Sequence, residues 1–224
     1  MNLVEGVKWS DGEPFDAEDL RFWWEDNVQD EKVTSRMPKD GMGVGTTMSV
    51  VDPFTIRFDF MEPQGPARVS ALAYIQGCPG PSHILKDHHP RYNPQKTYED
   101  YSNAQPADDL KNVVSLGMFV AVVHAPDQIV IMRRNPYYWK VDEKGNQLPY
   151  MNEMHFKLST WSDRTKQAVA GTGDFSNMEN PGNYVEALKQ SQSAEAPTKA
   201  QFDPRILVGT LSSTIQWMLV FRTM

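Results

Sequence analysis

The clearest pattern along the chain is an alternation of apolar and polar side chains that predicts two β-hairpins. Their arms are residues 46–51 with 54–60 and residues 118–124 with 128–134. In residues 54–60 the three phenylalanines and Ile56 share one face, and the polar residues share the other. This arrangement is typical of antiparallel strands that bury only one face. We expect Asp52-Pro53 to form the first turn and residues 125–127 the second.

Shorter runs predict further strands. They fall at residues 4–9, 153–159, 205–209 and 214–221. Residues 214–221 are apolar on both faces, which is typical of a central strand. The mixture of these strands with the helices below predicts a mixed α/β fold.

An amphipathic helix is predicted at residues 17–29, because Leu20, a tryptophan pair and Val28 recur at helical spacing. Asp16 is a good N-cap, and carboxylates follow it in the first turn, where the helix dipole favours negative charge. Further helices are expected at residues 67–75, 107–113, 162–170 (capped by Ser162 or Asp163) and 183–190. Residues 77–106 show little pattern, and a connection of this length inside a compact domain is usually functional or folded on its own terms.

Composition narrows the class of protein. The net charge of −7 and the isoelectric point of about 5.2 leave no basic stripe for phosphates, so we expect no nucleic-acid partner. No apolar run reaches about 18 residues, so no membrane-spanning helix is expected. The first residues lack the charged and apolar regions of a signal peptide. Cys78 is the single cysteine, so no internal disulfide forms.

Two groups of residues carry metal-ligating chemistry, but neither has the spacing of a metal site. They are Asp142, Glu143 and Asn146 in one loop, and His83, His88 and His89 in another segment. The loop fails the pattern of alternating oxygen ligands that an EF-hand needs, so a polar surface loop is favoured. The histidines fall short of the four ligands of a zinc site, so solvated or capping histidines are favoured.

No catalytic signature is present either. The sequence contains no G-x-S-x-G, no H-E-x-x-H, no phosphate-binding loop and no dinucleotide fingerprint. Cys78 sits in a Gly-Cys-Pro-Gly run with no motif that places a histidine beside it. Asp108 and Asp109 are better explained as charges at a helix start. We therefore expect neither an enzyme nor a bound cofactor or metal.

The stretch from Gln128 to Tyr150 joins a strand, an aromatic run and a polar loop in the order QIVIMRRNPYYWKVDEKGNQLPY. The strand ends at Asn135-Pro136, because proline has no N–H for the ladder. The run Tyr137–Trp139 offers roughly 150–250 Å² of surface per ring. We interpret these rings as packed beneath the loop rather than as a binding surface.

This stretch resembles the extracellular solute-binding proteins of ABC transporters, in the large branch, family 5, that binds peptides, nickel complexes and related solutes. A second run near the N-terminus, GVKWSDGEPFDAED, is similar to the same family. Its matching positions are Gly6, Val7, Lys8, Trp9, Asp11, Gly12, Pro14, Phe15, Ala17, Glu18 and Asp19. Residues 115–119 keep only Gly117 of a Gly-Thr-Gly-Pro-Tyr run found in many members, which indicates a divergent branch.

The resemblance implies a class II periplasmic-binding-protein-like lobe, with a mixed sheet flanked by helices and antiparallel hairpins. Residues 1–175 would be most of lobe I without its N-terminal strands, and residues 176–224 would begin lobe II. We therefore expect a fragment of a longer protein. Because unpaired strand edges and uncovered apolar faces are exposed, we expect the isolated chain to aggregate or to be partly unfolded.

The function implied by the resemblance is that of a monomeric receptor, which binds a peptide or similar small solute between two lobes. It would deliver the solute to the permease subunits of an ABC transporter. The parent protein would be periplasmic or extracellular and reach the membrane through the transporter. The alternative is a carbohydrate-binding or adhesion module that uses exposed rings of Trp23, Trp24 and residues 137–139.

By position in the family, lobe I contributes two solute-contacting segments. They contain Thr34, Ser35, Arg36 and Met37 in the first, and Ile75, Gln76, Gly77 and Cys78 in the second. The planar guanidinium of Arg36 would bind a carboxylate through two parallel hydrogen bonds. The alternative for Arg36 is a solvated loop arginine.

Overall fold

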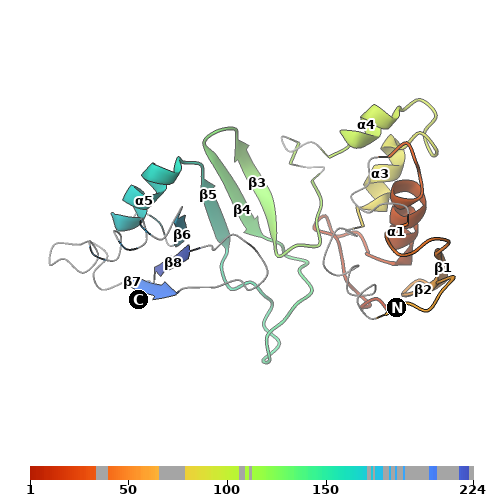
Figure 1. Cartoon of the computed structure of the whole chain (residues 1–224), viewed down its shortest axis with the longest axis horizontal. Coiled ribbons are helices and arrows are strands. Elements are labelled where there is room, and N and C mark those ends of the chain that lie inside the picture. The colour runs from red at the N-terminus through yellow and green to blue at the C-terminus, as the bar shows by residue number, and fades with distance from the viewer. Residues whose placement is uncertain are drawn as a thin grey trace. The chain divides into compact units, whose positions relative to one another are not determined.

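The computed structural model describes most of the first 170 residues and short pieces beyond them. The described residues are 1–33, 40–65, 79–105, 109–110, 113–170, 173, 175–178, 182, 185, 189, 202–205 and 217–221. They fall into two compact units, residues 1–156 and residues 157–224, which are described separately (Figure 1). No helix of the described residues is long and apolar enough to cross a bilayer.

The predicted N-terminal helix is present and changes its hydrogen-bond pattern halfway. It begins as α1 (Ala17–Phe22) and continues as a π-helical segment, η1 (Trp23–Val28). Asp16 is the N-cap, as predicted, because its side chain accepts a hydrogen bond from the backbone N–H of Glu18. At the other end the Gln29 N–H donates to the Trp24 carbonyl at 3.0 Å, a five-residue step typical of a π-helix. The sequence pattern did not predict this change of register.

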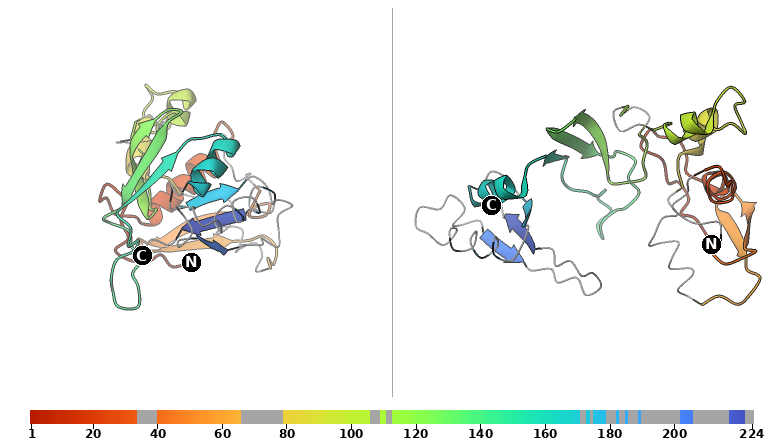
Figure 2. Two further views of the ribbon diagram at one scale, coloured as in Figure 1. Left: turned by 90° about the vertical axis from the view of Figure 1, so that its left-hand side faces the viewer. Right: turned by 45° about the horizontal axis from the view of Figure 1, so that its top comes forward.

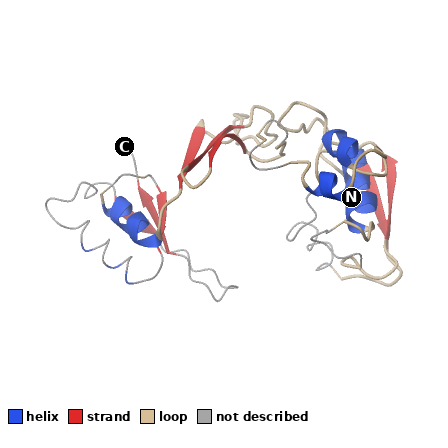
Figure 3. Cartoon of the chain, turned by 90° about the horizontal axis from the view of Figure 1, so that it is seen from above, coloured by secondary structure: helices blue, strands red, loops and turns tan. Residues whose placement is uncertain are grey.

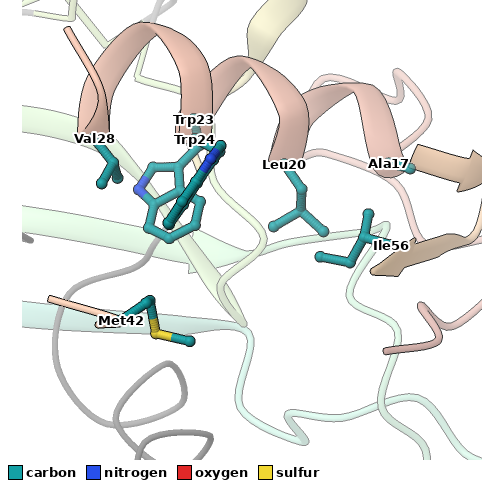
Figure 4. Close-up of a cluster of buried hydrophobic side chains, with 7 residues drawn as sticks. All are labelled: Ala17, Leu20, Trp23, Trp24, Val28, Met42 and Ile56. Atoms are coloured by element: carbon teal, nitrogen blue, oxygen red, sulfur yellow. The ribbon is translucent and has the colours of Figure 1, made fainter. Parts of the chain in front are cut away.

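The first predicted hairpin is confirmed and packs on this helix. It consists of β1 (Thr47–Asp52) and β2 (Thr55–Asp59), paired antiparallel with an irregularity between Val50 and Asp52. Asp52 closes the turn by accepting the N–H of Phe54 at 2.8 Å. Figure 3 shows the hairpin beside the N-terminal helix. The core between them contains Ala17, Leu20, Trp23, Trp24, Val28, Met42 and Ile56 (Figure 4).

Two short helices lie in the weakly patterned segment 77–106. They are α3 (Ser82–His88) and α4 (Tyr98–Ser102). Each is too short to produce a repeating apolar pattern, which explains why periodicity missed them. A capping box does mark α4, since Thr97 and Asp100 each bind the backbone N–H of the other. The two helices agree with the expectation that a connection of this length is functional or folded on its own terms.

The second predicted hairpin is also confirmed and belongs to a three-stranded sheet. Its arms are β3 (Phe119–Ala125) and β4 (Ile129–Arg134), antiparallel with an irregularity between Ala121 and Val123. The third strand, β5 (Glu153–Lys157), confirms the strand predicted after Tyr150 and gives the sheet order β3-β4-β5.

Among the described residues of the range 157–224 are a helix and a second three-stranded sheet. The helix is α5 (Trp161–Val169), and the strands are β6 (Phe175–Met178), β7 (Phe202–Arg205) and β8 (Trp217–Phe221). β8 lies between the other two and is antiparallel to both, so the predicted central strand is confirmed (Figure 2). The side chain of Thr160 accepts the Asp163 N–H at 3.2 Å, so Thr160 caps α5 rather than Ser162 or Asp163.

One predicted strand is absent from the described N-terminal residues. Residues 4–9 form only an isolated bridge between Lys8 and Pro14. Gly6 has a φ of +79°, which takes the backbone out of the extended region and interrupts the run. The helix expected at 67–75 lies outside the described residues, as do most residues of those at 107–113 and 183–190 and of the strand at 205–209. The division into lobes at residue 175 stays a prediction.

Candidate functional site

The two predicted solute-contacting segments lie outside the described residues. They are Thr34, Ser35, Arg36 and Met37, and Ile75, Gln76, Gly77 and Cys78. The described residues that flank them are 30–33, before the first segment, and 79–82, after the second. The site is therefore built from the groups that hold these flanking residues.

A buried carboxylate, Asp19, joins three parts of the N-terminal region. Only 2 % of Asp19 is exposed. Its oxygens accept the indole N–H of Trp9 at 3.0 Å, the backbone N–H of Ser82 at 2.9 Å and that of Asp16 at 3.3 Å. Since Ser82 begins α3, this one side chain fixes the start of α3 against the start of α1. The sequence signal for Asp19 predicted only a charge at a helix start.

On the surface beside Asp19, an ion-pair network connects the same two helices. Arg21 binds Glu18 through two nitrogens, at 2.7 and 2.5 Å, and Lys86 of α3 binds Glu18 at 2.5 Å. The hydrogen bonds from Arg21, followed by those from Lys86, lower the pKa of Glu18 to about 2. The network therefore depends on an ionised Glu18.

A second buried carboxylate, Asp26, lies in η1. Its oxygens accept the Arg91 guanidinium at 2.8 Å and the Tyr92 hydroxyl at 2.7 Å. Burial, and then the bond to Asp26, raises the pKa of Tyr92. The segment that follows α3 is thus tied to η1 by a charge-assisted pair.

Two further tyrosines donate to the same stretch of chain. The Tyr101 hydroxyl donates to Asn27 Oδ1 at 2.7 Å, and the Tyr98 hydroxyl donates to Asp30 Oδ2 at 2.9 Å. The other oxygen of Asp30 accepts the backbone N–H of Lys32 at 2.9 Å. We call Tyr92, Tyr98 and Tyr101 the tyrosine clamp. Nothing in the sequence pattern pointed to it, because its members lie more than 60 residues from their acceptors.

His89 fills the space inside the tyrosine clamp. It is fully buried, and its ring meets the rings of Phe22 and of all three clamp tyrosines, with centroids 4.6 to 6.0 Å apart. Its Nδ1 accepts the Arg91 N–H at 3.2 Å, while its Nε2 has no hydrogen-bond partner and lies 3.8 Å from Asp30 Oδ2. Within the described residues, no three His, Cys, Asp or Glu side chains are grouped to hold a metal ion. We expected a solvated or capping histidine; His89 is the C-cap residue of α3, but its ring lies in the core rather than in solvent.

The aromatic stretch after β4 is anchored by Asn135, the residue that directly follows the strand. Asn135 is fully buried, donates its amide to the Gly117 carbonyl at 2.9 Å and accepts the Tyr137 N–H at 2.9 Å. Tyr138 packs inward, but Tyr137 is 42 % exposed and Trp139 is 45 % exposed. The expectation that all three rings pack beneath the loop is therefore wrong for two of them, because side chains diverge in the turn that Asn135 sets.

Tyr137 joins the two motifs that suggested the family. Its ring lies against Gly12, where an added Cβ would be 3.2 Å from Cζ. The Lys8 ammonium lies 5.7 Å from the centre of the same ring. Tyr137 therefore connects the two stretches in the folded chain.

The polar loop after Trp139 is organised by Asp142. Its oxygens accept the N–H groups of Lys144 and Asn146 at 2.8 Å, the Asn146 amide at 2.9 Å and the Tyr150 hydroxyl at 2.7 Å. These bonds, led by the one from the Asn146 side chain, lower the pKa of Asp142 to about 2. The carboxylate is occupied by the loop itself, in agreement with the polar-loop interpretation.

The tryptophan pair of the alternative interpretation lies in the core. Trp23 and Trp24 are each 4 % exposed and belong to the buried cluster that also contains Met42 and Ile56 (Figure 4). These two rings are not accessible to a sugar, so that part of the carbohydrate-module interpretation is wrong. A pocket of about 280 Å³ lies at the end of β4, lined by Arg133, Arg134, Pro136, Gln147, Asn152 and Glu153. Its Arg133 is already paired with Glu153 at 3.0 Å.

The sequence model of bacterial extracellular solute-binding proteins, family 5 Middle, matches residues 1–212. The chain belongs to this family. A periplasmic alpha-galactoside-binding protein of Rhizobium meliloti is 50 % identical over 209 residues, which are 92 % of this chain and 30 % of that protein. A probable ABC transporter-binding protein of Deinococcus radiodurans is 23 % identical and matches 80 % of this chain and 30 % of its own length. The chain thus spans about 30 % of these curated relatives.

Solved structures of class II periplasmic binding proteins share the fold. The periplasmic binding protein MelB of Agrobacterium fabrum, in complex with stachyose, is 47 % identical, with a TM-score of 0.78, over 92 % of this chain and 31 % of MelB. The oligopeptide-binding protein OppA is 27 % identical, with a TM-score of 0.77, over 93 % of this chain and 35 % of OppA. The matched family and these relatives are solute-binding proteins, as the motifs predicted.

Proposed function

We propose that this chain is part of an ABC-transporter receptor that binds an oligosaccharide of the alpha-galactoside class. The observation that carries the proposal is the 50 % identity to the alpha-galactoside-binding protein over 92 % of the chain. The likeness to MelB in complex with stachyose supports the same class of solute. The peptide that the motifs first suggested is the second candidate, favoured by the weaker likeness to OppA.

In this proposal the receptor encloses its solute between two lobes in the periplasm and releases it to the permease, and it catalyses no reaction. Affinity would come from burial of the sugar and from polar groups that replace the water bound to its hydroxyls. Thr34, Ser35, Arg36 and Met37, with Ile75, Gln76 and Gly77, remain our proposed contacts. For a neutral sugar, the guanidinium of Arg36 would donate to hydroxyl oxygens instead of a carboxylate.

The test is a calorimetric titration. The protein is expressed from the whole reading frame that encodes this chain, including any sequence on either side. Stachyose is titrated against two controls of similar size, maltotetraose and tetra-alanine. We expect stachyose to bind at least tenfold more tightly than either control, and Arg36→Ala to weaken it measurably. Tighter binding of tetra-alanine would replace the sugar by a peptide, and unchanged affinity of Arg36→Ala would remove Arg36 from the site.

A further inference from the structure

The turn formed by residues 30–33 is shaped by one side chain, Asp30. Its Oδ1 accepts the Lys32 N–H at 2.9 Å, and its backbone carbonyl accepts the Val33 N–H at 3.1 Å. An aspartate that binds the N–H two residues ahead sets the direction in which the chain turns. The turn therefore depends on the orientation of the Asp30 carboxylate.

That orientation is fixed from a distant part of the sequence. The Tyr98 hydroxyl, on the first residue of α4, holds Asp30 Oδ2 at 2.9 Å. The ring of the same tyrosine lies 5.5 Å from the Lys32 ammonium, measured to its centroid. Tyr98 thus contacts two residues of the turn, Asp30 by a hydrogen bond and Lys32 through its ring.

The other two members of the tyrosine clamp act one step earlier. Tyr92 and Tyr101 bind Asp26 and Asn27, inside and at the end of η1, and do not touch the turn. A shift of one residue between π- and α-helical register would rotate the following side chains by about 100° and separate them from these hydroxyls. Tyr92 and Tyr101 thus fix the register of the helix, and Tyr98 fixes the direction of the chain that leaves it.

We propose that Tyr98 is a positioning residue for solute binding, because it orients through Asp30 the turn that leads into the residues assigned to solute contact. This inference rests on the proposed function, since the solute-contacting role of the residues from Thr34 onward comes from the family resemblance. Tyr98 lies 64 positions after Thr34 in the sequence. Its proposed role is indirect, through the position of the contacting segment.

The test compares two variants that remove one hydroxyl each from the same cluster. Tyr98→Phe deletes the bond to Asp30 and keeps the ring over Lys32, whereas Tyr101→Phe deletes the bond to Asn27. Because Tyr101 is buried, we expect Tyr101→Phe to lose at least as much stability as Tyr98→Phe. Both variants are made in the polypeptide used for the stachyose titration above, and stachyose affinity by calorimetry and urea midpoints are measured for both.

We expect Tyr98→Phe to weaken stachyose at least fivefold and Tyr101→Phe less than twofold, even where their urea midpoints fall equally. The proposal is overturned if affinity falls in proportion to stability in both variants. It is also overturned if the affinity of Tyr98→Phe is unchanged. If the unsubstituted protein binds neither stachyose nor tetra-alanine, the proposed function fails, and hydrogen exchange decides the positioning role. Faster exchange of the Lys32 and Val33 amides in Tyr98→Phe alone supports it, and equal exchange in both variants contradicts it.

Discussion

Asp19 and Asp142 each organise a family motif, but the first lies in a packed core and the second in a surface loop. Asp19 accepts three N–H groups that come from three separate places along the chain. Asp142 accepts four hydrogen bonds, all from residues within eight positions of it. Counting bonds would rank the loop as the more firmly held region.

Burial reverses that ranking. Around Asp19 the rings of Trp9 and Phe22 are buried, so a donor that loses its acceptor has no water to replace it. Around Asp142 the side chains of Val141 and Tyr150 are exposed, and water is available to every loop donor. The comparison teaches that the same motif chemistry is structural in the core and replaceable at the surface.

The largest expected effect is that of Asp19→Ala. It leaves the Trp9 indole N–H and the Ser82 N–H without an acceptor in the core, which we expect to cost roughly 3 kcal/mol of unfolding free energy. The measurement is urea unfolding followed by tryptophan fluorescence. Asp142→Ala is the matched control and should shift the midpoint far less. An equal or larger shift in the control would show that bond number, and not burial, decides.

Local chemistry accounts for the parts of this fold that the sequence predicts. Asp16 caps the first helix, Asp52 closes the first hairpin, and the apolar strand near residue 220 is central in its sheet. Each of these features is set by residues only a few positions apart. The two family motifs likewise predicted the class of fold, because their residues are contiguous.

The parts that could not be predicted depend on partners far apart in the chain. The acceptors of the tyrosine clamp, Asp26, Asn27 and Asp30, carry no local sequence signal for these bonds, and nothing local couples Asp30 to Tyr98. The sequence pattern does not predict the π-helical register of η1, whose Asp26 and Asn27 accept hydrogen bonds from the tyrosine clamp. The same limit applies to Asp19, whose charge was predicted at a helix start but whose bond to Ser82 spans 63 positions.

Gly12→Ala tests the junction between the two regions and should have an intermediate effect. Gly12 has a φ of +98°, and an added Cβ would press on the Tyr137 ring at 3.2 Å. The backbone conformation alone should cost about 1–3 kcal/mol. Gly145→Ala is the matched control, because its φ is +82° and nothing lies within 4 Å of an added Cβ. Urea midpoints should fall further for Gly12→Ala, and equal losses would mean that the contact with Tyr137 carries no strain.

The smallest effect should appear on acidification, where Glu18 and Asp142 have similarly lowered pKa values of about 2. A carboxyl with a folded pKa below its unfolded value of 4.5 stabilises the fold above pH 4.5, and this stability is lost as the pH falls towards 2. Because Glu18 is 43 % exposed, we expect less than about 1 kcal/mol from it after solvent screening.

Unfolding breaks the Lys86 bond to Glu18, which spans 68 positions, whereas the short-range bonds of Asp142 can re-form in an unfolded chain. The difference between the urea midpoints at pH 6 and pH 3 should therefore shrink, relative to the unsubstituted protein, more in Glu18→Gln than in Asp142→Asn. If the midpoints at the two pH values converge equally in both variants, the surface loop is coupled to global unfolding as strongly as the α1–α3 network. That result would contradict the difference between core and surface drawn from Asp19 and Asp142.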